Sequence, residues 1–273
     1  MPLETVPLSG TLGAEVRGAD LRAVDDETFA GIHQALLAHG VIYFRDQDIA
    51  PAQQLAFARR WGPPHFHPYM PGLPDHPEII EIVKNPEDRA TFGGEWHTDQ
   101  MFTPTPAMAT MLYAREVPTA GGDTLFADLY LAYDTLSDGM KAMLAGLRTF
   151  NLYSKKKDRA AAMAGKLKAP DTPAEPAEHP LIRPHAETGR EVLYISYEGI
   201  TRHIVGMTEA ESRPLLDWLM DHATRPELTC RLRWEVGTLA VWDNRRVLHM
   251  ALNDYQGQRR VMHRITIRGE RTS

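Results

Sequence analysis

His97 and Asp99, in the run from Glu95 to Asp99, are an imidazole and a carboxylate two positions apart. Because successive side chains of an extended strand alternate between its faces, both would project from one face, with Cα atoms about 6.6 Å apart. Both could then reach one metal ion. A third ligand from a distant segment would complete two histidines and one carboxylate, the facial set of non-haem Fe(II) oxygenases. The pattern indicates oxygen activation, although a chain with 12 His can contain such a pair by chance.

The third ligand that we predict is His249, at the end of the run that begins at Trp242. We expect this run to end a strand and enter a loop, with acidic and amide side chains that could orient a metal ligand. A lone histidine is more often structural than a ligand, so its position leaves both interpretations open. As a ligand, it would hold the metal together with His97 and Asp99.

Two arginines share one face of the last predicted strand. Arg260 and Arg264 point to one face, and His263 and Ile265 point to the opposite face, which is the more apolar. The arginines could lie in solvent, or in the lumen of a barrel, where each would need a compensating anion. Four residues of strand separate them by about 13 Å. In a lumen they could serve two different anions on either side of a metal, since a guanidinium grips carboxylate or sulfonate with two hydrogen bonds.

Hydrophobic spacing and capping residues predict the elements that would position these side chains. Helices are predicted from Asp25 or Asp26 to Gly40, at 53–61, at 138–147 after Ser137, and after the capping box at 208–211. Strands are predicted at 41–44, 78–83, within 108–126 before and after a turn at 121–124, and at 230–234, 238–242 and 261–267. We predict one domain over 1–273 that is mainly β with flanking helices.

Two stretches of the chain are predicted to lack regular structure. The Pro- and His-rich stretch 63–77 is expected to be a loop. The stretch 154–178 is polar and rich in Lys, Ala and Pro, so we expect an excursion over the surface that could serve as a lid.

Composition excludes several classes of protein. The net charge of −6 and the pI near 6.1 argue against a general binder of nucleic acids or anionic membranes. No apolar run approaches the ~20 residues of a membrane span, and the N-terminus has no pattern of a signal peptide. Cys230 is the only cysteine, so no internal disulfide can form. These features favour a cytoplasmic protein, where iron would stay ferrous.

Several segments in order resemble one known family. They are 10–18, 96–99, 121–125, 241–245 and 258–264. Together they are similar to the taurine dioxygenase/TfdA family of Fe(II)- and 2-oxoglutarate-dependent dioxygenases, over nearly the whole chain. The resemblance implies a double-stranded β-helix (jelly-roll) core. It implies that His97, Asp99 and His249 bind Fe(II), and that 2-oxoglutarate and O2 are co-substrates.

The resemblance also implies roles for residues that bind the organic molecules. Thr124 and Arg264 match the threonine and arginine that hold the distal carboxylate of 2-oxoglutarate. Arg260 and His67 match the pair that binds the anionic end of the substrate. The pair is more similar to that of taurine dioxygenases and alkylsulfatase dioxygenases than to that of the aryloxyalkanoate enzymes, because Pro68 follows His67.

The remaining pocket residues depart from the pattern of taurine dioxygenases. Those enzymes carry a polar cluster before the Trp-His-Thr-Asp run and a tyrosine three residues after the substrate histidine. This chain has Phe92 and Gly93 in the first place and Met70 in the second, and Ile200 replaces a pocket phenylalanine. An ammonium group would be left without polar partners, at a cost in free energy. A sulfonate, sulfate ester or carboxylate with an apolar tail is therefore favoured over taurine.

The leading hypothesis is hydroxylation of a carbon next to a heteroatom, after which the adduct collapses and releases sulfite, sulfate or a phenol. An aryloxyalkanoate dioxygenase, or a plain hydroxylase of a carboxylic acid or amino-acid derivative, is the alternative within the family. A non-catalytic cupin-like binding protein and a zinc hydrolase are alternatives from other classes, but neither uses Arg264 or Thr124. We expect a homo-oligomer that acts on a small anionic organic substrate and binds neither nucleic acid nor membrane.

Overall fold

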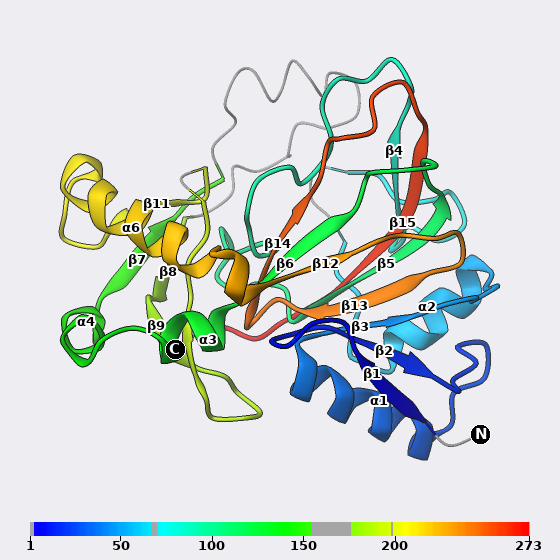
Figure 1. The fold of residues 1–273 in the computed structure, drawn as a ribbon, viewed down its shortest axis with the longest axis horizontal. Helices are drawn as coiled ribbons and strands as arrows, with labels where there is room; N and C mark the ends of the chain where they lie inside the picture. The colour runs from blue at the N-terminus through cyan, green and yellow to red at the C-terminus, as the bar shows by residue number, and fades with distance from the viewer. Residues whose placement is uncertain (1–2, 67–69, 154–175, 198, 273) are drawn as a thin grey trace.

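The computed structural model describes residues 3–66, 70–153, 176–197 and 199–272. Strands and helices follow one another as Figure 1 shows. The strands are β1 (Glu4–Pro7), β2 (Ala14–Arg17), β3 (Val41–Phe44), β4 (Ile80–Lys84), β5 (Ala109–Glu116), β6 (Thr124–Asp128), β7 (Arg148–Asn151), β8 (Ala177–Pro180), β9 (Ile182–Pro184), β10 (Glu191–Leu193), β11 (Thr201–Ile204), β12 (Thr229–Leu232), β13 (Leu239–Asp243), β14 (Val247–Ala251) and β15 (Arg260–Ile267). The helices are α1 (Asp26–His39), α2 (Pro51–Arg59), α3 (Leu129–Asp134), α4 (Asp138–Leu144), α6 (Glu209–Ala223) and the short 3₁₀ helix η1 (Pro226–Leu228).

Two sheets pack against each other at the centre of the molecule. The larger sheet has seven strands in the order β1-β2-β3-β13-β5-β15-β4, and the smaller has three in the order β12-β6-β14. Leu112 and Met262 of the larger sheet and Phe126 of the smaller belong to one buried apolar cluster, which fills the space between them. This arrangement confirms the predicted mainly β fold with a jelly-roll core.

The register of the strands decides which side chains face each other across the core. In the smaller sheet, β14 pairs with β6 so that His249 is opposite Phe126 and Ala251 is opposite Thr124. In the larger sheet, β15 pairs with β5, with Arg264 opposite Leu112. The histidine and the threonine therefore come from one wall of the sandwich and the arginine from the other.

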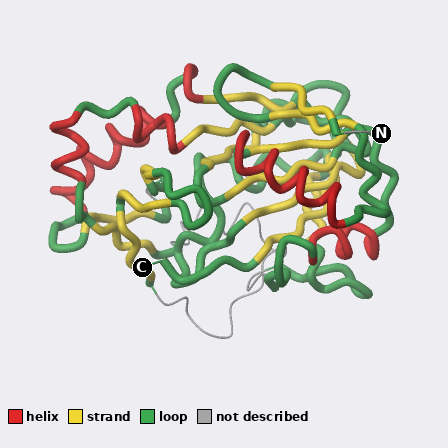
Figure 2. Tube along the Cα trace, turned by 90° about the horizontal axis from the view of Figure 1, so that it is seen from below, coloured by secondary structure: helices red, strands yellow, loops and turns green. Residues whose placement is uncertain are grey.

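Helices α1 and α2 cover the outer face of the larger sheet (Figure 2). Ile32 and Leu36 of α1 pack in one apolar cluster with Met111 of β5 and Ile265 of β15. Since β15 has this cluster on one side and the smaller sheet on the other, all eight of its residues are buried. Such a strand carries no alternation of exposed and buried residues.

A third apolar cluster lies beside the sandwich, around α3, α4 and α6 (Figure 1). The three-stranded sheet β11-β7-β8 and the hairpin β10-β9 belong to the same part of the molecule. In the described ranges, none of the helices has the length and apolar character that crossing a membrane requires.

Most predicted elements are confirmed, with small shifts at their ends. Asp25 caps α1 by accepting a hydrogen bond from the Thr28 amide at 2.8 Å, and Gly40 ends the helix with a φ of 71°. The capping box of Thr208 and Glu211 begins α6 as predicted. Helix α2 starts at Pro51, two residues before the predicted start, because proline suits the first turn of a helix.

The strand that carries His249 and the stretch 154–178 differ from the prediction or lie partly outside the described residues. His249 was expected in a loop, but the chain turns after Asp243 and returns as β14, so the histidine lies on a strand. The predicted surface excursion at 154–178 falls largely outside the described residues, and its last part, from Ala177, belongs to β8. Its role as a lid stays a prediction.

Candidate metal centre

The two histidines predicted as ligands sit side by side on the backbone. His97 and His249 form an isolated antiparallel bridge, in which each amide donates to the other carbonyl at 3.0 and 2.8 Å. The strand expected through Asp99 is not present, because the chain turns after the bridge and Gln100 has a φ of 57°. The alternation of a strand is therefore the wrong explanation for how Asp99 joins the histidines. The turn brings its carboxylate back to the imidazoles.

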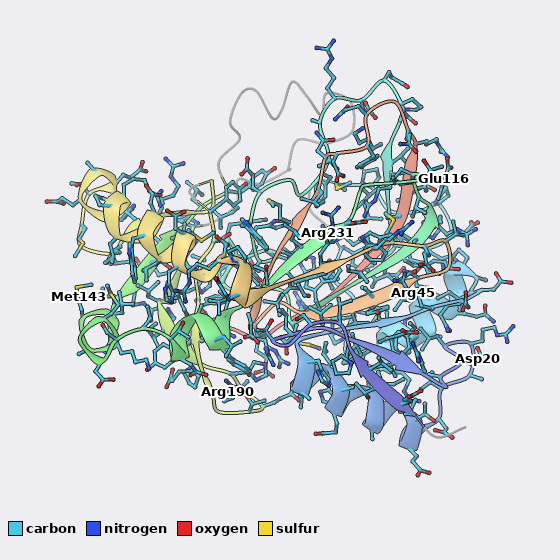
Figure 3. The ribbon with its side chains drawn as sticks, viewed as in Figure 1. Asp20, Arg45, Glu116, Met143, Arg190 and Arg231 are labelled. Carbon is cyan, nitrogen blue, oxygen red and sulfur yellow. The ribbon has the colours of Figure 1, made fainter. Side chains whose placement is uncertain are left out.

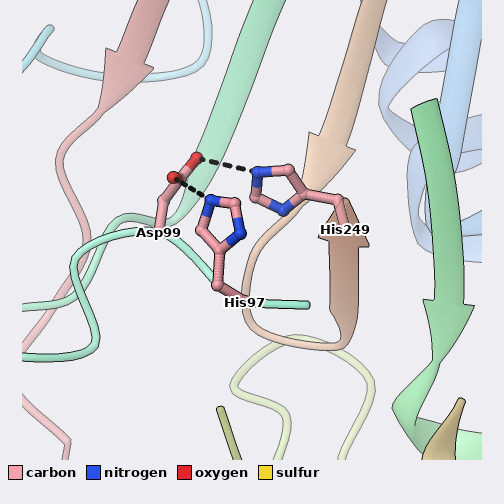
Figure 4. Close-up of side chains that lie close together, drawn as sticks. All are labelled: His97, Asp99 and His249. Carbon is pink, nitrogen blue, oxygen red and sulfur yellow. Dashed lines mark ion pairs between the residues drawn. The ribbon is translucent and has the colours of Figure 1, made fainter. Parts of the chain in front are cut away.

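The imidazoles of His97 and His249 and the Asp99 carboxylate converge on one point (Figure 4). One possible ligand atom from each lies within 4.8 Å of the others. Asp99 Oδ1 is 3.6 Å from His97 Nε2, and Oδ2 is 3.8 Å from His249 Nε2. These separations exceed ordinary hydrogen bonds but suit three atoms that share an ion. The donor set of two nitrogens and one carboxylate oxygen fits Fe(II).

Electrostatics keep these groups in the protonation states that bind metals. Burial and the neighbouring His97 lower the pKa of His249 well below its ordinary value, so its imidazole is neutral and has a free lone pair. Burial alone would raise the pKa of Asp99, but the Arg264 guanidinium and the two imidazoles outweigh it and hold that pKa well below its usual range. Asp99 is therefore a carboxylate anion.

Asp99 is held by two further side chains. Arg264 Nη2 lies 2.6 Å from Oδ1, and Thr110 Oγ1 donates to Oδ2 at 2.6 Å. Thr110 is in turn bonded to Asn244, which follows β13. The amide of Asn244 was expected among the groups that could orient a metal ligand, but its link to Asp99 through Thr110 was not predicted.

A cavity of about 40 Å³ is lined by two of the three predicted ligands, His97 and His249. Its lining includes predicted metal, co-substrate and substrate residues together with apolar ones, namely Ile82, Phe92, Gly93, His97, Leu112, Thr124, Trp242, His249, Ala251, Arg260 and Arg264. That volume is far below the roughly 300–1,000 Å³ of a typical pocket for an organic ligand.

Three predicted substrate residues are not part of this lining. Ile200 is buried in the apolar cluster around α3 and α6 rather than in the cavity wall. Met70 is described but does not line the cavity. His67 lies outside the described residues.

Arg260 is a buried guanidinium that forms no ion pair with the residues that the structure describes. It is 5% exposed, and its Nε and Nη2 atoms make no hydrogen bond in the part of the chain that the structure describes. Asp123 is nearby but forms an ion pair at 2.6 Å with Arg231, which extends from β12 (Figure 3). Burial lowers the pKa of Arg260, but arginine keeps its proton in proteins. Among the described residues, none therefore forms an ion pair with this positive charge.

Thr124 and Arg260 both contact Trp234. Trp234 Nε1 donates to Thr124 Oγ1 at 3.0 Å, and the guanidinium carbon of Arg260 is 5.8 Å from the centre of the Trp234 ring. Arg264 reaches in another direction, toward Asp99, with its guanidinium carbon 5.7 Å from the Phe92 ring. The contacts thus group Thr124 with Arg260, whereas the resemblance paired Thr124 with Arg264.

The placement of both arginines is decided by the fold. Arg260 and Arg264 are 5% and 4% exposed. Of the two placements that periodicity left open, the interior of the sandwich is correct. Each guanidinium faces the cavity beside the candidate metal ligands.

Fold, ligand set and paired guanidiniums together define a metal-dependent oxygenase that takes anionic organic molecules. Residues 4–266 match the family described as "Taurine catabolism dioxygenase TauD, TfdA family", and the chain belongs to this family. It is an Fe(II)- and 2-oxoglutarate-dependent dioxygenase that uses O2. This confirms the prediction of the family and its cofactors, and excludes the zinc hydrolase and the non-catalytic binding protein.

Characterised relatives cover nearly the whole chain. It is 33% identical over 279 residues to an alkylsulfatase of Acinetobacter baylyi, in an alignment that covers 99% of this chain and 86% of that protein. It is also 33% identical to an alpha-ketoglutarate-dependent 2,4-dichlorophenoxyacetate dioxygenase of Cupriavidus pinatubonensis, with 95% and 96% covered. The crystal structure of a taurine dioxygenase from Burkholderia xenovorans superposes with a TM-score of 0.83 at 36% identity, covering 98% of this chain and 91% of that one.

Proposed function

We propose that this dioxygenase hydroxylates a carbon next to the heteroatom of a sulfate ester or sulfonate with an apolar tail. The hydroxylated adduct would then collapse with C–O or C–S cleavage and release sulfate or sulfite. The observation that carries the proposal is the pair of buried guanidiniums, Arg260 and Arg264, in one largely apolar cavity beside the metal ligands. A buried guanidinium needs an anion, and two of them suit a reaction with two organic anions.

His97, Asp99 and His249 are the residues that we propose to hold Fe(II). Bound there, Fe(II) would supply the oxidation, by activating O2 while 2-oxoglutarate is decarboxylated to succinate. The protein has to hold the substrate C–H bond close to the ion and to exclude water from it. Burial of Asp99 and His249 supports that second task.

Arg260 and Thr124 are our candidates for the distal carboxylate of 2-oxoglutarate. Nε and Nη2 of Arg260 have no hydrogen-bond partner among the described residues, and Arg260 and the Thr124 hydroxyl both contact Trp234. A charged donor and a neutral hydroxyl on one carboxylate give a charge-assisted hydrogen-bonded site. This division of labour is the reverse of the one that the resemblance implied.

Arg264 is then the candidate for the anionic head of the primary substrate. A divalent cation on Asp99 would place a positive charge next to Arg264, and an incoming sulfate or sulfonate would compensate both. His67, outside the described residues, is the second proposed partner of that anion. Phe92, which lies near Arg264, is proposed to contact the substrate's apolar part. Met70 and Ile200 stay predictions for the same part of the substrate.

The apolar lining supports a substrate without an ammonium group. Ile82, Leu112 and Ala251 line the cavity, with Phe92 and Gly93 at the place where taurine dioxygenases carry polar side chains. An ammonium group there would lose its hydration without gaining partners. The relative named alkylsulfatase and the relative named "Alpha-ketoglutarate-dependent sulfate ester dioxygenase" support a sulfate ester in particular.

An aryloxyalkanoate substrate is the second candidate. Relatives named (S)-phenoxypropionate and 2,4-dichlorophenoxyacetate dioxygenases are as similar to this chain, at 33% identity, as the alkylsulfatase. A carboxylate would serve Arg264 as well as a sulfate would, and hydroxylation next to the ether oxygen would release a phenol. Plain hydroxylation of a carboxylic or amino-acid derivative, without cleavage, is the remaining alternative.

The experiment that separates these candidates is a panel of anions with the purified Fe(II)-loaded protein. Succinate formation, O2 consumption and release of sulfate, sulfite or phenol are measured for alkyl sulfates, alkyl sulfonates, taurine and phenoxyalkanoates. The proposal requires coupled succinate formation and sulfate or sulfite release with an alkyl sulfate or sulfonate. Coupled turnover only with phenoxyalkanoates, or hydroxylation without cleavage, would overturn it in favour of the alternatives.

Other expectations about the whole protein complete the proposal. We propose one catalytic domain over 1–273, with the 154–178 segment as its lid, in a cytoplasmic homo-oligomer. Light scattering of the purified protein tests its oligomeric state. Limited proteolysis with and without 2-oxoglutarate tests whether the 154–178 segment becomes protected when the cavity is filled.

A further inference from the structure

Asn244 occupies a fully buried position directly after β13, with both ends of its amide bonded. Its Oδ1 accepts a hydrogen bond from Trp242 Nε1 at 3.0 Å, and its Nδ2 donates to Thr110 Oγ1 at 2.9 Å. The indole N–H can only donate, so it fixes Oδ1 on its own side. The amide of Asn244 therefore has only one orientation, with the N–H groups toward Thr110.

This orientation determines the direction of the next hydrogen bond. The hydroxyl of Thr110 has a single proton, and it accepts from Asn244. Its proton is therefore directed to Asp99 Oδ2, 2.6 Å away. Trp242, Asn244 and Thr110 form a one-way chain of donors that ends on the carboxylate among the candidate metal ligands.

Asn244 also contacts the chain directly before that carboxylate. Its carbonyl accepts from Thr98 Oγ1 at 2.6 Å, and its Oδ1 is 3.4 Å from the Asp99 amide. Asp99 lies in a turn rather than a strand, so no sheet ladder fixes its backbone. Asn244 provides that support instead, from both the main chain and the side chain.

We propose that Asn244 is a positioning residue, which acts through Thr110 to hold the Asp99 carboxylate at the angle that metal binding requires. The inference rests on the proposed role of Asp99 as an Fe(II) ligand. Removing Thr110's oriented proton lets the carboxylate rotate toward Arg264, with which it already forms an ion pair. The loss should appear in metal affinity, even without any substrate or turnover.

The test measures Mn(II) binding to the metal-free full chain by isothermal titration calorimetry. Asn244→Ala and Thr110→Val should each weaken Mn(II) binding by roughly 10- to 100-fold, the usual effect of losing a group that orients a metal ligand. Thr110→Ser keeps the hydroxyl and should bind Mn(II) like the wild type. Because the two residues act in series, the double variant should bind no more weakly than the weaker single variant.

A second buried Asn–Thr pair provides the matched control. Asn151 donates to Thr149 Oγ1 at 3.0 Å, and both residues are fully buried in the sheet of β7. Asn151→Ala should destabilise the fold in a comparable way, as measured by thermal unfolding, and leave Mn(II) affinity unchanged. An equal loss of affinity in this variant would show a general packing effect and overturn the proposal.

The remaining outcomes are equally decisive. Near-normal Mn(II) affinity in Asn244→Ala and Thr110→Val, or fully additive losses in the double variant, would overturn the proposed chain. If Asn244→Ala does not fold, the contrast between Thr110→Val and Thr110→Ser decides. A wild-type protein that binds no Mn(II) would instead overturn the assignment of the metal site, and the proposed function with it.

Discussion

Arg264 Nη2 lies 2.6 Å from Asp99 Oδ1, and both side chains are 5% exposed. Such a buried pair is costly to break by removing one partner, because the other charge remains in the interior. A divalent cation on Asp99 changes this balance, since the guanidinium then faces a positive ion and gains from an additional anion. Metal and substrate anion are therefore expected to bind with positive coupling.

Variants of the candidate ligands test the metal centre. His97→Ala, Asp99→Ala and His249→Ala should each abolish Fe(II)-dependent succinate formation, because the described part of the chain offers only these three side chains to share the ion. His33→Ala is the control, because this half-buried histidine pairs with Glu187 far from the cavity. Coupled turnover near the wild-type level in all three ligand variants would contradict the assignment.

Substitution of the two arginines separates their roles. Arg260→Ala should chiefly raise the concentration of 2-oxoglutarate that is required, and Arg264→Ala should chiefly weaken the primary substrate. Loss of a buried charge partner costs about 2–5 kcal/mol, which corresponds to a change in affinity of roughly 30- to 4,000-fold. Titration of each ligand against both variants measures the difference.

The opposite result is equally informative. If Arg264→Ala chiefly affects 2-oxoglutarate, the division of labour that the family resemblance implied is correct and ours is wrong. Thr124→Val removes the hydroxyl that accepts from Trp234. Like Arg260→Ala, it should raise the concentration of 2-oxoglutarate that is required, but by a smaller factor.

The sequence predicted the three candidate ligands but not the backbone geometry that brings them together. The types and spacing of His97, Asp99 and His249 indicated metal chemistry, because imidazole and carboxylate groups are its usual donors. The turn at Asp99 and the strand at His249 were missed. Arg245 and Arg246 lie in the turn between β13 and β14. Their sequence suggests exposed side chains, since a charged pair seldom lies in a core. Their burial depends on partners that only the fold brings close.

Those partners are carboxylates from distant segments. Arg246 is 2% exposed and pairs with Asp128 at 2.6 Å, while Arg245 pairs with Asp243 and Glu187. A buried charge of this kind is tolerated because its counter-charge is present. Such compensation depends on tertiary contacts, so no local pattern in the sequence reveals it. The same holds for the burial of Arg260 and Arg264, which depends on a second sheet that covers β15.

The preference for the substrate's tail follows from the apolar lining. An alkyl sulfate or sulfonate should have a higher kcat/KM than taurine, because taurine's ammonium would lie among Ile82, Leu112 and Phe92. Each buried methylene adds about 0.8 kcal/mol, so three more favour the longer substrate by roughly 50-fold. Competition between taurine and a straight-chain sulfonate series, followed by coupled succinate formation, measures this. If taurine wins, the inference from the lining is wrong.

The stability of the fold at acidic pH depends on a buried carboxylate at the end of β13. Asp243 is fully buried and accepts from Arg245 Nη2 at 2.7 Å and from His185 Nε2 at 3.0 Å. Burial alone would raise the pKa of Asp243, but Arg245 and His185 lower it well below its ordinary value. A depressed folded-state pKa contributes stability above the unfolded value of about 3.9, and this stability is lost as pH falls through the folded pKa.

Asp243→Asn should therefore destabilise the protein by about 3–5 kcal/mol at pH 7, because it removes the buried charge that Arg245 and His185 share and leaves Arg245 with only its more exposed partner, Glu187. The difference from the wild type should shrink below about pH 4, where the wild-type carboxylate begins to lose its advantage. Urea unfolding of both proteins at pH 7 and at a pH below about 4 measures this difference in the free energy of unfolding. Asp20→Asn is the control. Arg22 also lowers the pKa of Asp20, to about 2, but both side chains are exposed, with Asp20 at the periphery of the molecule (Figure 3). Solvent screens this pair, so stability should change far less. An unchanged difference between wild type and Asp243→Asn at the two pH values would contradict the prediction.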